Sequence, residues 1–145
     1  MFKTGQDENI YKDALYVREK VFVDEQGVSQ EDEIDQFEHT AQYIVGYDNN
    51  HQPIATARYR IVDGIVKVER VAVLSSMRGQ NIGQALMNTL EADALQNGYH
   101  HFKLGAQIHA IPFYEKLGYY KYGDLFMDAG IEHYNMEKII NSDNS

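Results

Sequence analysis

The stretch from Val71 to Leu86 has the order of residue types found where a strand, a glycine-containing loop and a helix N-terminus form an anion-binding turn. An apolar run typical of a strand ends at Val73, a loop with two glycines and Arg78 follows, and a helical pattern begins at Ile82. The first backbone N–H groups of a helix lack partners within the helix, so such a junction attracts anions. The phosphate-loop motifs G-x-x-x-x-G-K-[ST] and G-x-G-x-x-G are absent. The pattern predicts either an anion-binding turn or an ordinary strand-to-helix turn.

Three titratable side chains are candidates for proton transfer. Glu69 lies in an apolar run typical of a strand, where burying a carboxylate costs free energy unless it has a function or a cationic partner such as Arg58 or Arg70. His39 and His133 are the other two, because imidazole titrates near neutral pH. A lone histidine is more often a hydrogen-bonded structural residue, and that alternative stays open for both.

The composition excludes several other chemistries. The chain has no cysteine, which excludes a disulfide framework, a thiolate metal site and a cysteine nucleophile. No arrangement of serine and histidine is typical of a nucleophile, so we expect direct group transfer without a covalent enzyme intermediate. Adjacent histidines in a strand point to opposite faces, so His100, His101 and His109 are not expected to share an ion. No metal site is predicted.

Acidic residues are concentrated in one segment. The chain has 13 Lys and Arg residues against 22 Asp and Glu residues, a net charge of −9, which disfavours nucleic acids and anionic membranes as partners. No Lys or Arg lies between Val21 and Ala57. This segment is either a solvated acidic loop or a source of field that attracts a cationic substrate. Its acidic residues are Asp24, Glu25, Glu31, Asp32, Glu33, Asp35, Glu38 and Asp48.

The size and the hydropathy pattern predict a cytoplasmic protein of one domain. The chain has 145 residues, near the common size of a compact domain, so we expect a single domain over residues 1–145. No apolar run approaches the roughly 18 residues that a membrane-spanning helix needs. The first residues are polar and acidic, unlike a signal peptide.

Two local patterns are especially clear. Asp7 is a candidate N-cap for a helix over residues 8–24, in which Ile10, Ala14, Val17 and Val21 form an apolar stripe. An ordered loop with one short helical turn is expected from 26 to 38. Asp63-Gly64 separates two strands by two residues, which is typical of a hairpin with a type I′ turn.

The remaining patterns complete a mixed α/β sheet flanked by helices. Strands are predicted over residues 41–47, 54–62, 65–73, 101–106, 119–122 and 134–138, and helices over 82–97 and 111–117. The first three of these strands are expected to be antiparallel. Residues 141–145 are expected to fray.

The order of elements, together with two motifs, resembles the GNAT superfamily of acetyl-CoA-dependent N-acetyltransferases over nearly the whole chain. The motifs are Arg78-Gly-Gln-Asn-Ile-Gly83 and Ala110-Ile-Pro-Phe-Tyr114-Glu-Lys-Leu-Gly118-Tyr119. They are similar to the family patterns Q/R-x-x-G-x-G/A and N-x-x-A-x-x-F-Y-x-x-x-G-F. Asn81 replaces the usual middle glycine, and asparagine is the other residue that best adopts a positive φ. Gln107 replaces the usual asparagine.

A narrower set of segments resembles the ElaA-like branch of this superfamily. These segments are Arg18-Glu-Lys-Val-Phe-Val-Asp-Glu25-Gln26, Glu38-His39-Thr40-Ala41 and Gly130-Ile-Glu-His133. The branch has no single acceptor that the resemblance carries over.

The resemblance implies a GNAT-like fold, with a central, mostly antiparallel sheet whose middle strands splay apart. It implies transfer of an acetyl group from acetyl-CoA directly to a primary amine of a small molecule or a peptide. Tyr114 would donate a proton to the leaving thiolate, and Glu69 or His133 would remove the amine proton. The implied acceptor-binding residues are Arg18, Glu25 and His39. The implied CoA-binding residues are Val71, Ala72, Val73, Arg78, Gly79, Gln80, Asn81, Ile82, Gly83, Gln84, Gln107, Phe113 and Tyr114.

Two other functions remain open at this point. One is a CoA-binding regulatory module that keeps the fold with weak or no catalysis, and the other is a scaffold that binds a different phosphorylated ligand at the Arg78 loop. The exposed edges of a mixed sheet in this fold often pair into dimers, so a homodimer is one of the oligomeric states that stay open.

Overall fold

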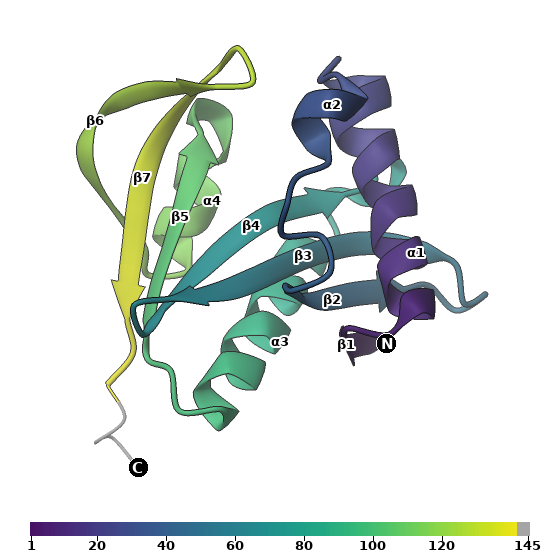
Figure 1. Ribbon diagram of the computed structural model, residues 1–145, viewed down its shortest axis with the longest axis horizontal. Helices are drawn as coiled ribbons and strands as arrows, with labels where there is room; N and C mark the ends of the chain where they lie inside the picture. Colours follow the sequence, from purple (N-terminus) through teal and green to yellow (C-terminus); the bar gives the residue numbers. More distant parts are fainter. Residues whose placement is uncertain (142–145) are drawn as a thin grey trace.

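The computed structural model describes residues 1–141 and contains a seven-stranded sheet (Figure 1). The strand order is β1-β2-β3-β4-β5-β7-β6, and every neighbouring pair is antiparallel except β4 and β5. This confirms the predicted mixed sheet. The strands are β1 (Phe2–Gly5), β2 (Gln42–Tyr47), β3 (Pro53–Val62), β4 (Ile65–Val73), β5 (His101–Gln107), β6 (Tyr120–Asp128) and β7 (Ile131–Ile139).

Helices cover both faces of the sheet. Side chains alternate along β2, so Tyr43 and Val45 pack against α1 while Ile44 packs into the core with α3. Figure 1 shows α1 over one face of β2, β3 and β4 and α3 on the other face, while α2 lies next to the helix that continues α1 as η1. The helical segments are α1 (Glu8–Arg18), the π-helix η1 (Glu19–Glu25), α2 (Gln30–Glu33), the 3₁₀ turns η2 (Ser75–Met77) and η3 (Ile108–Ala110), α3 (Ile82–Gln96) and α4 (Ile111–Lys116).

The local patterns of the sequence are confirmed. Asp7 accepts a hydrogen bond from the Ile10 N–H at 2.9 Å and caps α1, and the predicted apolar stripe is buried. The helix continues to residue 25, but its last turns are a π-helix rather than an α-helix. Asp63 and Gly64 have φ values of 53° and 77°, as a type I′ turn requires. The short helical turn predicted between residues 26 and 38 is α2.

Three strands differ from the prediction. The strand β1 was not predicted, because its four residues lack an apolar pattern. The strands β6 and β7 are each nine residues long and extend well beyond 119–122 and 134–138. Nearly all of β6 is exposed, and its register against β7 shifts between Tyr122 and Phe126, so neither burial nor alternation marks it in the sequence. Of the residues expected to fray, 142–145 lie outside the described range.

The two middle strands separate along their length. They pair only from Val66 opposite Phe102 to Val68 opposite Leu104, and then diverge, as Figure 1 shows. The strand β4 also holds one extra residue relative to β3 between Glu69 and Ala72, with Arg70 at φ 55°. Such a bulge bends a strand and redirects its side chains. The expected splay is therefore present, and it opens beside the bulge.

A buried arginine–carboxylate network fastens the acidic segment to the sheet. Arg18 is fully buried and contacts Glu33 at 3.0 Å and Glu38 at 2.8 Å. Arg58, also fully buried, contacts Glu38 at 3.0 Å and Asp35 at 2.5 Å. The network is completed by Arg60, Glu69 and Arg70. It balances four arginines against four carboxylates, so this part of the segment is neither a solvated loop nor free to attract a cation.

The described residues contain no helix that is long and apolar enough to cross a membrane.

Candidate active site

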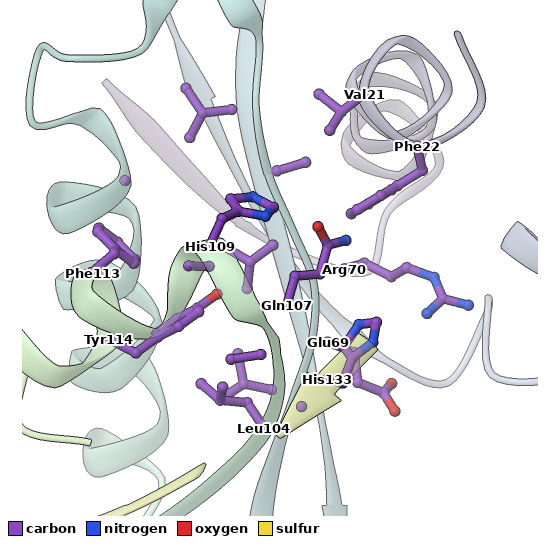
Figure 2. A pocket seen from close by; sticks show the side chains of 18 of the residues that line it. Val21, Phe22, Glu69, Arg70, Leu104, Gln107, His109, Phe113, Tyr114 and His133 are labelled. Carbon is purple, nitrogen blue, oxygen red and sulfur yellow. The ribbon is translucent and has the colours of Figure 1, made fainter. Parts of the chain in front are cut away.

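A cleft of about 1300 Å³ occupies the gap between the diverging strands β4 and β5. Its walls come from η1, the turn before α3, the edge of β4, the end of β5, α4 and the β6–β7 hairpin. Figure 2 shows Phe113 and Tyr114 on one side of it, with Glu69, Arg70 and His133 on the other. Because no strand pairs with β4 on this side beyond Val68, the backbone of residues 69–73 faces the cleft.

The anion loop, residues 78–84, has the backbone that the sequence predicts for it. Asn81 has φ 62° and Gly79 has φ 82°, so the asparagine adopts the positive φ expected of it. Within residues 1–141, no group accepts a hydrogen bond from the backbone N–H groups of residues 79–84. These N–H groups include the first ones of α3, where the helix dipole favours negative charge. The loop can therefore bind an anion such as a phosphate group.

Gly83 is required by a close contact. A Cβ atom at this position would lie 3.1 Å from Cζ of Phe113, so α3 approaches the α4 aromatic ring only because the residue is glycine. The Phe113 ring in turn packs edge-on against Tyr114, with centroids 5.0 Å apart. The contact couples the position of the anion loop to that of Tyr114.

Arg78 is held by an ion pair across the mouth of the cleft. Its Nη1 and Nη2 donate to the two carboxylate oxygens of Glu25 at 2.5 and 2.7 Å, and its Nε donates to the Val73 carbonyl at 3.1 Å. The hydrogen bonds from Arg78 lower the pKa of Glu25. Glu25 lies at the end of η1, where the helix dipole disfavours a carboxylate, so Arg78 compensates an otherwise unfavourable position.

Gln107 faces Gln26 across the same opening. The two amides exchange hydrogen bonds of 2.9 and 3.4 Å, which link the end of β5 to the segment after η1. Glu25 and Gln26 therefore connect the end of η1 to the turn before α3, through Arg78, and to the end of β5, through Gln107. Gln26 was not predicted as a site residue, because no local pattern in the sequence indicates a partner 81 residues away.

Tyr114 presents a hydroxyl to the cleft. The side chain is 7% exposed, and Figure 2 shows its oxygen pointing into the open space. No group in the described part of the chain forms a hydrogen bond with it. Burial raises the pKa of Tyr114, so the hydroxyl stays protonated at neutral pH and is available as a donor.

Glu69 lines the cleft but is held by two arginines. Arg60 donates to both carboxylate oxygens at 2.8 and 2.9 Å, and Arg58 Nε donates at 3.1 Å. Burial raises the pKa of Glu69, but the hydrogen bonds and charges of the two arginines outweigh burial and leave it below its usual value. A carboxylate with these partners is a weak proton acceptor.

His133 also lines the cleft and is 8% exposed. Its Nδ1 lies 2.7 Å from the Ile131 carbonyl oxygen. A carbonyl only accepts, so the neutral ring carries its proton on Nδ1 and leaves a lone pair on Nε2. Nothing within residues 1–141 hydrogen-bonds to Nε2.

Two predicted acceptor-binding residues lie away from the cleft. Arg18 is buried in the arginine–carboxylate network, where Glu33 and Glu38 bind its guanidinium, so no part of it is free to contact an acceptor. His39 is exposed and packs against Tyr11, with ring centroids 5.0 Å apart. Neither side chain lines the cleft, so the structure does not bring these two residues together with the other predicted site residues. Glu25, the third predicted residue, does line the cleft.

The other predicted residues of the turn and of β4 line the cleft, except Gln80. Phe22, His109 and Phe126 also line the cleft and were not predicted as site residues. The described chain has no group of three or more side chains that could hold a metal ion. With an anion loop at one end, a protonated hydroxyl on one wall and an unpartnered imidazole nitrogen on the other, the cleft is suited to proton transfer on a phosphate-bearing ligand.

Comparisons with known proteins agree with this arrangement. A family model described as an acetyltransferase (GNAT) domain matches residues 6–140. An uncharacterised N-acetyltransferase of Bacillus subtilis, YjcF, is 45% identical over 135 residues, which are 92% of this chain and 96% of the relative.

Solved structures give the same result for the fold. The crystal structure of Escherichia coli ElaA has a TM-score of 0.83 and 26% identity, over 95% of this chain and 98% of that one. An acyl-CoA N-acyltransferase from Pseudomonas aeruginosa has a TM-score of 0.83 and 22% identity, over 95% and 98% of the two chains.

Proposed function

Because the chain belongs to the GNAT family of acetyltransferases, we propose that it transfers an acetyl group from acetyl-CoA directly to a primary amine of a small molecule or a peptide. The observation that carries this proposal is a single cleft with unpaired backbone N–H groups at one end and the Tyr114 hydroxyl on its wall. The first feature suits a diphosphate, and the second suits a leaving thiolate.

The residues at the diphosphate end fit CoA. The N–H groups of residues 79–84 and the Arg78 guanidinium would hold the pyrophosphate, because both are donors placed at a helix N-terminus. The open edge of β4 from Val71 to Val73 offers backbone groups to the amide-containing arm of the cosubstrate. Gln107 and Phe113 border the same path.

The chemistry requires two proton-transfer groups. Bound acetyl-CoA supplies an activated acetyl thioester. An alkyl ammonium has a pKa of about 10, so a base must remove a proton before the amine can react. Tyr114 donates its hydroxyl proton to the sulfur, and Glu69 or His133 is positioned to accept the amine proton. Glu25 remains the candidate for contact with the acceptor.

The direct test is acetyl transfer to a panel of primary amines and peptides. A thiol-reactive dye reports released CoA without background, because the protein has no cysteine. Turnover with any amine supports the proposal. Tight CoA binding with no transfer favours the regulatory module, and displacement of CoA by an unrelated nucleotide at lower concentration favours the other phosphorylated ligand.

Glu25→Gln is expected to tighten acetyl-CoA binding about two- to fivefold. The carboxylate of Glu25 occupies the guanidinium of Arg78 that a phosphate would need, and an exposed ion pair of this kind is worth up to about 1 kcal/mol. Calorimetric titration of both proteins with acetyl-CoA measures the ratio of the two Kd values.

Asp24→Asn is the matched control for this variant. It removes the same charge one residue away, and within residues 1–141 Asp24 forms an ion pair only with Lys20, at 3.8 Å and on the surface. The control is expected to leave the Kd nearly unchanged. Equal effects of the two variants would show that net charge rather than competition at Arg78 sets the affinity.

A further inference from the structure

The identity of the base is the open part of the proposed function, on which this inference rests. Glu69 is a poor candidate, because Arg60 and Arg58 occupy its oxygens and its pKa lies below the usual value. A base must have a lone pair free to accept a proton in the cleft. His133 has one.

The backbone fixes the tautomer of His133. The hydrogen bond to the Ile131 carbonyl, two residues away in β7, places the ring proton on Nδ1. The nitrogen that remains, Nε2, has no protein partner in the described chain, although the side chain is 92% buried. An unpartnered nitrogen on a buried ring that lines the cleft is available to a ligand.

A second ring fixes the plane of the imidazole. Phe126 stacks on His133 with centroids 5.5 Å apart and an interplanar angle of 27°. Phe126 follows the register shift in β6 and packs over Gly105 of β5, where a Cβ atom would lie 3.1 Å from the ring. The position of Phe126 therefore depends on a bulge in one strand and a glycine in another.

The charged groups around His133 are largely compensated. Glu69 is paired with Arg58 and Arg60, and Arg70 is paired with Glu33 and Asp35. Four other charged side chains of the surrounding elements are exposed: Lys67 of β4, Lys116 of α4, Asp128 of β6 and Glu132 of β7. Three more are half-buried and have partners: Glu137 pairs with His101, Lys138 pairs with Glu91, and Lys103 lies over the Tyr122 ring.

We propose that His133 Nε2 accepts the proton of the acceptor ammonium and that Phe126 is the positioning residue that holds the ring for this step. The amine N–C bond forms as the C–S bond breaks. The ammonium loses two protons. His133 accepts the first and releases it to solvent. Tyr114 donates its hydroxyl proton to the sulfur and is reprotonated by the second. The products are an amide, a thiol and one released proton.

His133→Gln is expected to lower kcat/KM about 10- to 100-fold. A base must be unprotonated to accept a proton, so log kcat/KM of the wild type is expected to rise with pH on the acid side of its profile, and this rise is expected to disappear in the variant. His39→Gln removes an exposed imidazole outside the cleft and is expected to leave the profile unchanged. A rise that persists in His133→Gln and disappears in Glu69→Gln would overturn the proposal.

A readout independent of turnover is the imidazole nitrogen spectrum. In ¹⁵N NMR at pH 8, wild-type His133 is expected to be the Nδ1–H tautomer, and Phe126→Leu is expected to mix the two tautomers while lowering kcat more than it raises KM. An Nε2–H tautomer in the wild type would refute the assignment even if acetyl transfer itself is confirmed. If no amine is acetylated, the spectrum still tests the geometry, so the two failures are distinguishable.

Discussion

Replacing Tyr114 with phenylalanine is expected to lower kcat about 100- to 1000-fold. The change removes only the hydroxyl, which is the protonated donor on the cleft wall, and keeps the ring that packs against Phe113 and Tyr119. The Kd for acetyl-CoA is therefore expected to change less than about twofold, because the hydroxyl acts in the transition state and does not contribute to binding of the cosubstrate. Steady-state kinetics and calorimetric titration of the same preparation measure the two quantities.

Tyr119→Phe is the control for this loss. Tyr119 is buried next to Tyr114, but its hydroxyl donates to Glu91 at 2.8 Å and the residue does not line the cleft. Its removal is expected to lower stability and to leave kcat within about threefold. If Tyr114→Phe also keeps kcat within threefold, Tyr114 is not the proton donor.

Glu38→Gln is expected to reduce the free energy of unfolding by about 3 kcal/mol, a fall of roughly 10 °C in Tm. Glu38 is 4% exposed and accepts hydrogen bonds from Arg18, Arg58 and Tyr11. A neutral amide leaves the charges of two fully buried guanidinium groups less compensated. Chemical denaturation measures the loss. Glu31→Gln, at an exposed position in the same segment, is expected to change stability by less than about 0.5 kcal/mol.

The same carboxylate predicts how stability depends on pH. Burial raises the pKa of Glu38, but Arg18 and the other donors outweigh burial and lower the pKa from 4.5 to about 2. Its contribution is therefore complete above pH 4.5 and is lost as the pH falls toward 2. The difference between the wild type and Glu38→Gln is expected to shrink over this range. A difference that stays constant down to pH 2 would contradict the role given to Glu38.

Features that depend on neighbours in the sequence could be predicted. The Asp7 cap, the stripe of α1 and the Asp63-Gly64 turn each rest on a local rule, and the structure contains all three. The positive φ of Asn81 was predicted for the same reason, because few residue types tolerate that backbone.

Features that depend on partners far away in the sequence could not be predicted. Arg18 contacts Glu33 and Glu38 only after the segment folds back over α1 and the sheet. From the sequence, Arg18 was therefore placed among the acceptor-binding residues, and the acidic segment was either a solvated loop or a source of field for a cationic substrate. The pairing of Gln26 with Gln107 spans 81 residues. Phe126 packs over Gly105 only because of the bulge in β6, and no local pattern in the sequence predicts that bulge.

The central claim is that the anion loop binds the diphosphate of acetyl-CoA, and Asn81→Asp tests it most directly. Aspartate has nearly the same shape, tolerates a positive φ and is favoured at a helix N-terminus, so the variant is expected to keep or raise the wild-type Tm. Its added charge would repel an anion at the loop. In calorimetric titrations, the wild type is expected to bind acetyl-CoA with a micromolar Kd and the variant at least about tenfold more weakly. Wild-type protein that does not bind acetyl-CoA, or equal Kd values for the two proteins, would contradict the account.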